Sequence, residues 1–441
     1  MTQNEFLVLC TRGSRDEIEE ALNNGADVNK HGMIHGTSVS PLFAASLEGN
    51  LEGIVTLIEN GAKPADGYIA SVISDNKLAS GLLSVCGADI NSLDDAGHTA
   101  LLCAVTSNKP DAVKWLIEHG ADVNVKTGGG YSVLTYAALM TAERETSEIS
   151  PEIISLLMLN GADYKEALIL AIRTDNIKFV SELINNGADL NLPSMKDHSP
   201  LSAALINPNR PADPEMIELL ASNGADVNEV FDFGDNTISN PLNISISFNR
   251  PDIAEILLKH GANPNVRDYN GRTSLVFAVV TSKEMIEVFL EHGADPNITD
   301  NEGRTPLMLA AIDGGNVPEA AEILIVHGAD VNIQDNNGLS ALMWAVTGKD
   351  RSADFLISGM IRTGGIMAEG AEAWFALVSL YTAVKHELQL DVIRTLIVHG
   401  ADVNLRDSKS MNALAYALMN DDEDIADILI SAGSELHLRT T

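Results

Sequence analysis

The sequence DNEGRTPLMLAAIDGGNVPEAAEILIVHGAD spans residues 300–330 and contains the signals that decide the fold. Asp300 to Gly303 predict a tight turn, because aspartate and asparagine start turns and glycine accepts a positive φ. Thr305 is expected to cap a helix, with Pro306 at the first helical position, where no amide hydrogen is needed. The small and apolar residues that follow, 307–311, predict one buried face on this first helix.

A second helix is predicted in the remainder of the same stretch. Pro318 is expected to open it, with Glu319 in the first turn, where a negative charge is favourable. His327 and Gly328 should end it, with the glycine in the left-handed conformation. Each helix of the pair has an apolar face that the pair cannot cover alone. Stacked neighbours would bury these faces, so the stability is expected to be a sum over adjacent pairs.

The closing signal recurs through the whole chain. Glycine followed by alanine and usually aspartate stands at Gly25, Gly61, Gly87, Gly120, Gly161, Gly187, Gly224, Gly261, Gly293, Gly328 and Gly400, with a weaker copy at Gly433. The 72-residue spacing from Gly328 to Gly400 is interpreted as two degenerate repeats, the first closing near Gly364. About 13 units are therefore predicted.

The start of the first helix carries the resemblance to a known family. The chain resembles ankyrin-repeat proteins, whose Thr-Pro-Leu-His-x-Ala signature is similar to Thr305-Pro306-Leu307, Ser199-Pro200-Leu201, Ser40-Pro41-Leu42 and Asn240-Pro241-Leu242. The resemblance implies an all-α ankyrin-repeat solenoid of helix pairs with short β-hairpin fingers, as a single domain over 1–441. The histidine of the family signature is absent and is replaced by Phe43, Leu102, Met308 and Met343 among others. Apolar contact is expected to take over its role between repeats.

The repeat is irregular at its ends and at defined interior places. Residues 1–29 are expected to form an N-terminal cap, 349–390 the degenerate repeats, and 407–441 a C-terminal cap whose acidic run, 421–424, faces water. The spacing is only 26 after Gly61 and again after Gly161, which predicts helix pairs without the turn. Extra residues near 142–150 and 207–213 fall between helices, and those near 30–40 and 229–240 fall in fingers.

The composition limits the classes of partner. Sixty-two acidic residues against 28 basic ones give a net charge of −34. Such a surface repels phosphate backbones, so direct nucleic-acid binding is not expected, whereas a basic protein would be attracted. The alternative is that the charge only keeps a long array soluble. No apolar run is long enough for a membrane span, and the three scattered cysteines favour a reducing cytoplasm.

The candidate partner-binding surface is carried over from the family. Partners of ankyrin-repeat proteins usually dock on the finger tips and on the exposed side of the first helices. In this chain the best stretch is 229–348, and its candidate binding residues are Phe231, Phe233, Tyr269, Arg272, Arg304, Asn336 and Leu339. Exposed aromatic residues and arginines often anchor interfaces. The alternative is that the phenylalanines pack against the array and that the arginines pair with Asp268 and Glu302.

Other motifs are interpreted as structural. Histidines that end second helices, His119, His260, His292, His327 and His399, are expected to be caps, since neighbouring helices lie too far apart for a shared metal ion. Gly128–Gly130 are expected to form a turn, because no Gly-Lys-Ser/Thr follows. Trp115, Trp344 and Trp374 are expected in the core. A reactive thiol at Cys86 is an alternative to a simple helix end.

No nucleophile, base and orienting acid can be assembled, so no catalytic residue, metal, cofactor or small-molecule substrate is expected. The leading hypothesis is a non-catalytic scaffold for protein–protein interaction. One alternative is an acidic inhibitor, antitoxin-like or DNA-mimicking, that blocks a basic nuclease or nucleic-acid-binding protein. Another is a regulatory subunit of an enzyme.

Overall fold

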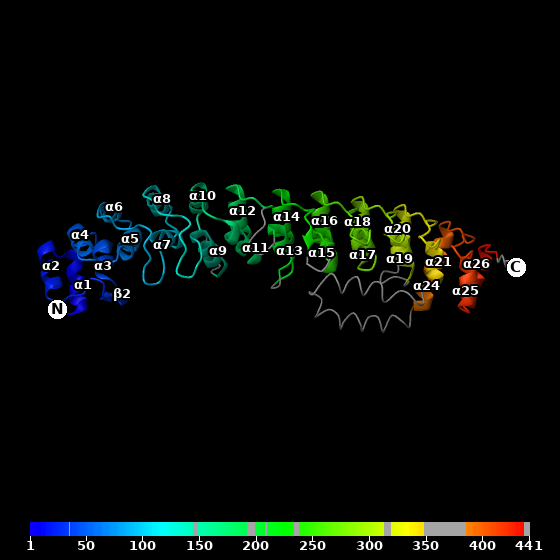
Figure 1. The fold of residues 1–441 in the computed structure, drawn as a ribbon, viewed down its shortest axis with the longest axis horizontal. Coiled ribbons are helices and arrows are strands. Elements are labelled where there is room, and N and C mark those ends of the chain that lie inside the picture. Colours follow the sequence, from blue (N-terminus) through cyan, green and yellow to red (C-terminus); the bar gives the residue numbers. More distant parts are fainter. Residues whose placement is uncertain are drawn as a thin grey trace. The chain divides into compact units, whose positions relative to one another are not determined.

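A computed structural model describes residues 1–34, 36–143, 149–191, 199–207, 210–232, 238–312, 319–347 and 385–435. These residues divide into two compact units, Met1–Ala204 and Leu205–Thr441. Each unit is described by itself, and the single domain over 1–441 stays a prediction. The fold class is confirmed, since the described elements are helices with a few short strands (Figure 1).

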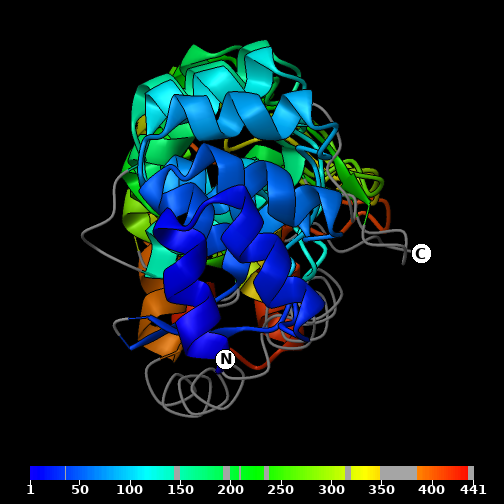
Figure 2. The same cartoon turned by 90° about the vertical axis from the view of Figure 1, so that its left-hand side faces the viewer.

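The first unit contains the following helices: α1 (Gln3–Arg12), α2 (Arg15–Asn23), α3 (Pro41–Glu48), α4 (Leu51–Glu59), α5 (Pro64–Ile73), α6 (Lys77–Val85), α7 (Ala100–Thr106), α8 (Pro110–Glu118), α9 (Val133–Glu143), α10 (Pro151–Leu159), α11 (Lys165–Arg173) and α12 (Ile177–Asn185). Helix α13 (Pro200–Leu205) spans the boundary between the units. The predicted N-terminal cap is the pair α1 and α2, drawn in dark blue and nearest the viewer in Figure 2.

The second unit contains the following helices: α14 (Pro214–Ser222), α15 (Pro241–Ser247), α16 (Pro251–Lys259), α17 (Ser274–Ala278), α18 (Lys283–Glu291), α19 (Pro306–Ile312), α20 (Ala320–Val326), α21 (Ala341–Thr347), α24 (Lys385–Val398), α25 (Ala413–Met419) and α26 (Glu423–Ser431). Taken together, the described ranges hold 24 helices in twelve consecutive pairs. The predicted count of about 13 is therefore not confirmed.

The predicted helix signals act as expected where they are described. Thr305 Oγ1 accepts a hydrogen bond from the Met308 amide at 3.2 Å, and α19 begins at Pro306. Four further prolines stand at the start of second helices, at Pro110, Pro151, Pro214 and Pro251. Pro318 lies outside the described residues. Helix α20 begins at Ala320, so Glu319 is its N-terminal cap and does not lie inside its first turn.

The core lies between neighbouring pairs. In the second unit the first helices contact one another in the order α15, α17, α19, α21, α25, and the second helices in the order α14, α16, α18, α20, α24, α26. Figure 1 shows the two rows. Leu102, Met308 and Met343, which replace the family histidine, are each 1–2% exposed, so the expected apolar contact at this position is confirmed.

An asparagine four residues after a closing glycine links successive repeats at eight places in the described residues. Asn297 Nδ2 donates to the Gly328 carbonyl at 2.9 Å, and its Oδ1 accepts from the Asp330 amide at 2.8 Å. Equivalent bridges join Asn29 to Gly61, Asn91 to Gly120, Asn124 to Gly161, Asn228 to Gly261, Asn265 to Gly293, Asn332 to Gly400 and Asn404 to Gly433. These side chains therefore contribute hydrogen bonds between successive repeats.

The long spacing between Gly328 and Gly400 was misinterpreted from the sequence. Asn332 Nδ2 donates to the Gly400 carbonyl at 3.2 Å, and Asp402 donates its amide hydrogen to Asn332 Oδ1 at 2.8 Å. Helices α21 and α24 contact each other as one pair, with α19 and α20 on one side and α25 and α26 on the other. The repeat closing at Gly328 is thus followed directly by the one closing at Gly400. Residues 348–384, which stand between α21 and α24 in the sequence, lie outside the described residues, as do residues 349–384 of the predicted degenerate repeats.

The fingers are mostly short turns. Helix α5 begins three residues after Gly61, and α11 begins four residues after Gly161, which confirms that these two pairs lack a turn. Paired strands form where the sequence has extra finger residues: β1 (Gly32–Ile34) with β2 (Thr37–Val39), and β3 (Phe231–Asp232) with β4 (Ile238–Ser239), both antiparallel. Elsewhere in the described ranges the finger is a turn, in one case with a single bridge between Gln334 and Ser340.

The histidines that end second helices are caps, as predicted. His119, His292, His327 and His399 each place Nδ1 2.7–2.9 Å from the carbonyl oxygen four residues earlier. His260 is the C-cap of α16, and its Nε2 lies 2.9 Å from Glu218 Oε1. Each histidine therefore belongs to a helix end.

Candidate partner-binding surface

Four turns of the second unit are organised around an aspartate, which is buried in three of them and largely buried at Asp268. Asp300 Oδ1 accepts hydrogen bonds from the amides of Glu302 and Arg304, both at 2.9 Å. Asp268, Asp335 and Asp407 accept the equivalent two bonds in their own turns. Backbone donors on a carboxylate make strong hydrogen bonds, so each turn is held in one conformation.

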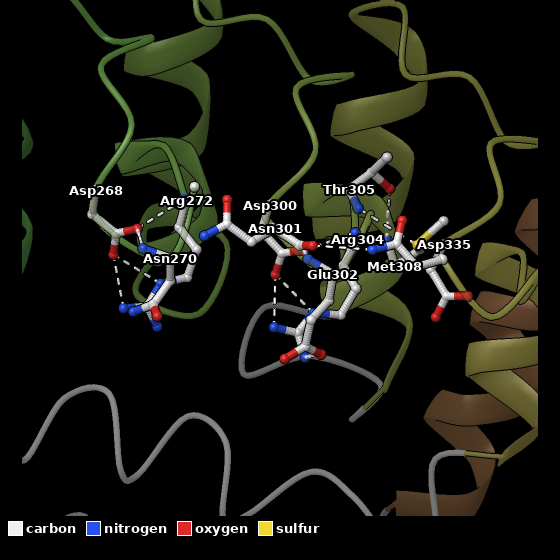
Figure 3. A network of polar contacts seen from close by, with 12 residues as sticks. Asp268, Asn270, Arg272, Asp300, Asn301, Glu302, Arg304, Thr305, Met308 and Asp335 are labelled. Carbon is white, nitrogen blue, oxygen red and sulfur yellow. Dashed lines mark hydrogen bonds and ion pairs between the residues drawn. The ribbon is translucent and has the colours of Figure 1, made fainter.

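The second carboxylate oxygen of each turn aspartate accepts a hydrogen bond from a side chain either four or nine residues later in the sequence. Arg272 and Arg304, four residues after Asp268 and Asp300, donate from Nε and from the terminal guanidinium nitrogens at 2.7–2.9 Å (Figure 3). In the next two turns the fourth residue is apolar. Trp344 Nε1 donates to Asp335 Oδ2 at 3.1 Å, and the Tyr416 hydroxyl donates to Asp407 Oδ2. These two donors stand nine residues after their aspartate, on the first helix.

The turns are also bonded to one another. The Asn301 amide donates to the Asn270 carbonyl at 2.8 Å, and Asn301 Nδ2 donates to the Tyr269 carbonyl at 2.9 Å. The Asn336 amide and side chain make the same two kinds of bond to Glu302 and Asn301, both at 3.0 Å. Ser408 then donates its amide hydrogen to the Asn337 carbonyl at 2.9 Å. The turns at 268–272, 300–304, 335–339 and 407–411 therefore form one continuous ridge, the turn ridge.

The structure separates the predicted binding residues into two groups. The Tyr269 side chain is 65% exposed at a turn tip, and Asn336 is exposed on the next turn but one. Arg272 and Arg304 have side chains only 11% and 9% exposed, and Leu339 is 6% exposed. Arg304 pairs with Asp300 and with Glu302, each at 2.7 Å, and Arg272 pairs with Asp268 at 2.8 Å.

The expectation that Arg272, Arg304 and Leu339 present interface groups is therefore corrected. The arginines hold the turns by satisfying the aspartates, which is close to the alternative drawn from the sequence. Phe231 lies in β3, and its side chain is not among those described. Phe233 lies outside the described residues. Tyr269 and Asn336 are the predicted residues that the structure leaves accessible.

Sequence reasoning missed aromatic residues on the first helices beside the turn ridge. Phe277 is partly exposed and lies beneath Arg272, whose guanidinium carbon is 4.9 Å from the ring centroid. Trp344 and Tyr416 occupy the equivalent helical position two and three repeats later. The signal was present in the spacing. Two turns have arginine four residues after the aspartate, and in these the ninth residue after the aspartate is Phe or Leu. The other two turns have Leu or Met four residues after the aspartate, and in these the ninth residue is Trp or Tyr.

The outer face of the second unit carries acidic rows. Acidic residues stand nine positions before the closing glycine in six successive repeats, at Glu215, Asp252, Glu284, Glu319, Asp391 and Asp424. A second row stands six positions before it, at Glu218, Glu255, Glu287, Glu322 and Asp427, with Arg394 in place of the acid in one repeat. In the first unit, Leu78 and Lys178 interrupt the row nine positions before the closing glycine, and the positions six before it form no comparable acidic row. Lys259 and Lys283 pair with Glu255 and Glu287, so the negative charge is partly compensated.

The remaining motifs are described where the structure covers them. Gly128–Gly130 form a turn in which the Gly130 amide donates to the Thr127 carbonyl at 2.8 Å, as predicted. Trp344 is buried, Trp115 is half-buried against the His119 ring, and Trp374 lies outside the described residues. Burial raises the pKa of the Cys86 thiol, so it lacks the lowered pKa that a reactive cysteine needs. Burial also raises the pKa of Cys10 and of Cys103 to about 12.

The described residues also bear on metal binding and on membrane spanning. In the described ranges, no group of three or more His, Cys, Asp or Glu side chains is placed to hold a metal ion. None of the helices in that part of the chain is both long and apolar enough to cross a bilayer.

Comparison with known proteins agrees with this architecture. The family model for ankyrin repeats in three copies matches residues 68–164, 139–230, 230–300 and 282–363, which is more than half of the chain. The chain belongs to the ankyrin-repeat family. The resemblance drawn from the Thr-Pro-Leu motifs is thereby confirmed.

The ankyrin-repeat relatives are diverse. The chain is 26% identical over 305 residues to the ankyrin repeat and KH domain-containing protein mask-1 of Caenorhabditis elegans, covering 61% of this chain and 11% of that protein. It is 34% identical over 171 residues to a putative ankyrin repeat protein of fowlpox virus, covering 37% and 48%. It is also 26% identical over 307 residues to the E3 ubiquitin-protein ligase KEG of Arabidopsis thaliana, covering 64% and 18%. The chain spans less than half the length of each of these relatives.

Proposed function

We propose that the protein is a non-catalytic scaffold that binds another protein through the turn ridge and the adjoining first helices of the second unit. Ankyrin repeats generally mediate protein–protein interaction, which supports the class of function. The observation that carries the proposed surface is Tyr269, a 65% exposed aromatic residue on a turn that is hydrogen-bonded within itself and to the next turn. The three free cysteines suit a reducing cytoplasm.

A fixed backbone matters because an interface residue must be ordered when the partner arrives. The Asp268 carboxylate accepts two amides of the Tyr269 turn, and the Tyr269 carbonyl accepts the Asn301 side chain. The tyrosine therefore loses little backbone freedom on binding, and only its side chain must be ordered. Tyrosine is among the residues most often found as energetic centres of interfaces.

The exposed side chains of the turn ridge indicate which groups a partner would present to it. Asn270, Asn301 and Asn336 are exposed along it and add amide donors and acceptors beside the tyrosine. A partner would bury the Tyr269 ring and form hydrogen bonds with these amides, while Phe277 adds apolar contact on the helix side. Because Arg272 pairs with Asp268 and Arg304 pairs with Asp300 and Glu302, shape and hydrogen bonding would set the specificity at these two turns.

The test is capture of a partner from native lysate by the full chain and by two variants. Tyr269→Ala combined with Asn336→Ala is expected to lose the captured protein. Tyr131→Ala is the matched control, since Tyr131 is 39% exposed on a turn of the first unit. Retention of the same partner by the double variant at undiminished yield would show that the surface lies elsewhere.

An acidic inhibitor is the second candidate function, and the two acidic rows of the second unit favour it. Rows of like charge raise the association rate with a basic surface, and exposed charges are screened over about 8 Å at physiological salt. Affinity for the partner should then fall steeply between low and physiological salt. Glu218→Gln with Glu322→Gln should reduce the association rate, whereas Glu52→Gln with Glu59→Gln, exposed on α4 of the first unit, should not. Salt-independent binding would rule this candidate out.

A third candidate function is a regulatory subunit of an enzyme. In that case the enzyme would be the protein that binds the turn ridge. Two relatives, the Arabidopsis ligase and a putative palmitoyltransferase ZDHHC13 of Danio rerio, are named as enzymes. The matched region covers 18% and 29% of those proteins, so their activities are not transferred to this chain. The identity of the captured protein decides between this version and a scaffold without an enzyme.

A further inference from the structure

Helix α6 of the first unit presents an apolar face to solvent. Leu78 is 73% exposed and Val85 is 85% exposed, and Gly81 stands between them in the helix. Spacings of three and then four residues place all three on one side of an α-helix. We call these three residues the α6 face. Helices α3 and α7 contact α5, and α4 contacts α6, so this pair lies inside the stack and not at its end.

The α6 face stands where other repeats carry charge. Leu78 lies nine positions before its closing glycine, and in the other eleven repeats that position holds ten acidic residues and Lys178. Val85 lies at the position of Glu59 on α4 and of Glu118 on α8. Among the twelve second helices in the described ranges, α6 is the one without an acidic residue. Single exposed apolar residues are common, but apolar residues grouped on one face mark interaction sites.

Gly81 indicates that another backbone comes close to this helix. Three of the described helices contain an interior glycine, at Gly53, Gly67 and Gly81. A Cβ at Gly53 would lie 2.6 Å from Asn50 Nδ2, and one at Gly67 would lie 3.0 Å from Leu42 Cδ2, so packing within the chain accounts for both. A Cβ at Gly81 would meet nothing within 4 Å. Because glycine destabilises a helix relative to alanine, a glycine that the chain's own packing does not require suits close approach from outside.

Acidic residues flank both ends of the α6 face. They occupy the positions of Leu78 and Val85 on α4 and on α8, the neighbouring second helices in the row (Figure 1). All four are exposed: Glu52, Glu59, Asp111 and Glu118. Glu59 pairs with Arg15 at 2.8 Å, and Lys77 and Lys114 offset part of the remaining charge.

The placement of these acids selects the occupant. On each neighbouring helix the two acids are seven residues apart, which is about 10 Å along the axis. Basic residues at the same spacing on a partner helix would face them. A second copy of the chain would instead bring its own four acids against these, and like-charge contact opposes binding.

We propose that the α6 face is a second interaction surface, formed by other residues than the turn ridge, and that it binds an amphipathic helix of a partner protein. The partner helix places a small residue over Gly81 and apolar side chains against Leu78 and Val85. Lysine or arginine residues beside its apolar stripe, seven residues apart, face the acids of α4 and α8. Loss of this binding and loss of a partner from the turn ridge are separate outcomes, because they follow from different substitutions.

The probe for this proposal is a labelled synthetic helix of three heptads, with a leucine stripe, alanine at the centre of the stripe and lysines on both sides. A scrambled peptide of the same composition and a twin with leucine in place of the central alanine are the two comparison probes. Binding to the full chain is measured by fluorescence anisotropy at about 0.15 M salt, where exposed charges are screened over about 8 Å. The alanine-centred helix is expected to bind more tightly than either comparison probe.

Leu78→Glu with Val85→Glu is expected to weaken the binding of this probe about tenfold or more, the size of effect typical of losing an interface anchor. The variant gives α6 the acids that α4 and α8 already carry, so its circular dichroism spectrum and unfolding midpoint should stay unchanged. Its two added negative charges would by themselves attract a lysine-rich probe. Leu159→Glu with Val326→Glu is the matched control, since these residues are 81% and 71% exposed on α10 and α20 and add the same charge elsewhere.

Gly81→Leu separates close approach of a helix from general apolar attraction. Leucine has a higher helix propensity than glycine, and an added Cβ meets nothing within 4 Å, so the unfolding midpoint of the free chain should not fall. The larger side chain adds apolar surface but holds a partner helix away, so the probe should bind more weakly. A glycine with no role in binding would leave the affinity unchanged.

Four results would overturn the proposal. The first is equal binding of the scrambled peptide, which would mean general attraction to an acidic chain. The second is undiminished binding to the Leu78→Glu and Val85→Glu variant, and the third is unchanged or tighter binding to Gly81→Leu. The fourth is a dimer in sedimentation experiments that the double variant dissociates, which would make a second copy the occupant.

Discussion

Replacing Arg304 by methionine should destabilise the second unit, although Arg304 was first expected at an interface. The Arg304 and Asp300 side chains are 9% and 1% exposed, and the guanidinium donates to Asp300 Oδ2 at 2.7–2.8 Å. Removing one partner of a buried pair leaves an uncompensated charge and costs about 3–5 kcal/mol. For a unit of this size that corresponds to a fall of roughly 6–20 °C in the midpoint of thermal unfolding.

The loss should be recovered by a substitution nine residues after the aspartate. In the turn at 407–411, Met411 stands at the position of Arg304, and the Tyr416 hydroxyl donates a hydrogen bond to Asp407 instead. Arg304→Met with Leu309→Tyr would reproduce that arrangement at Asp300. Since a hydrogen bond to a charged group contributes about 1.5–3 kcal/mol, the tyrosine is expected to recover about that amount in the methionine background. In the Arg304 background the tyrosine should be neutral or destabilising, because Leu309 is 1% exposed and the added volume must be accommodated.

The assay is a double-mutant cycle. Free energies of unfolding come from denaturant titration of the full chain, and hydrogen exchange of the turn amides reports whether the loss is local to the turn. A favourable coupling energy between positions 304 and 309 supports the exchange of partners at the aspartate. Additive effects of the two substitutions would refute it, as would an Arg304→Met variant of unchanged stability.

Three further predictions concern Gly338, Asn332 and Cys103. Gly338→Ala should cost about 1–3 kcal/mol, since φ is +82° and a Cβ would lie 2.9 Å from the Asp407 Cα; an unmoved denaturation midpoint would contradict the close approach of these turns. Asn332→Ala removes the hydrogen bonds to Gly400 and Asp402 and should lower the free energy of unfolding by about 1–2 kcal/mol in the same denaturant titration. An unchanged free energy of unfolding would contradict the bridge. With its pKa raised to about 12, the Cys103 thiol should react with a disulfide reagent at pH 8 roughly a thousandfold more slowly than a free cysteine, and faster as pH rises because the thiolate fraction grows; a rate like that of free cysteine at pH 8 would contradict this.

Local signals accounted for most of the fold. Thr305, Pro306 and the closing glycines are short-range signals, and each was found where the sequence indicated. The two missing turns after Gly61 and Gly161 followed from spacing alone. The direct contact between the repeats that close at Gly328 and Gly400 did not, because a 72-residue spacing fits two weak repeats as well as one interrupted repeat. What decides between them is the bond from Asn332 to Gly400, a contact between distant residues.

The candidate surface was harder to predict than the fold. Arg272 and Arg304 occupy turn tips, which suggests exposure, yet each side chain folds back onto the aspartate four residues earlier. Local sequence does not show whether a carboxylate already has a donor. When the turns are aligned with one another, the residues at positions four and nine after each aspartate show which of the two supplies the donor to its carboxylate. Tyr269 differs because no carboxylate of its turn needs a donor from it, so its ring is left at the surface.

The most direct test of the proposed function is hydrogen exchange by mass spectrometry on the full chain, with and without its captured partner. Protection is expected in peptides covering 267–272, 299–304 and 334–339, and on the first helix that carries Phe277. The first-unit turn at 127–131 should exchange equally in both states. Protection confined to the second helices, or to the first unit, would contradict binding on the turn ridge.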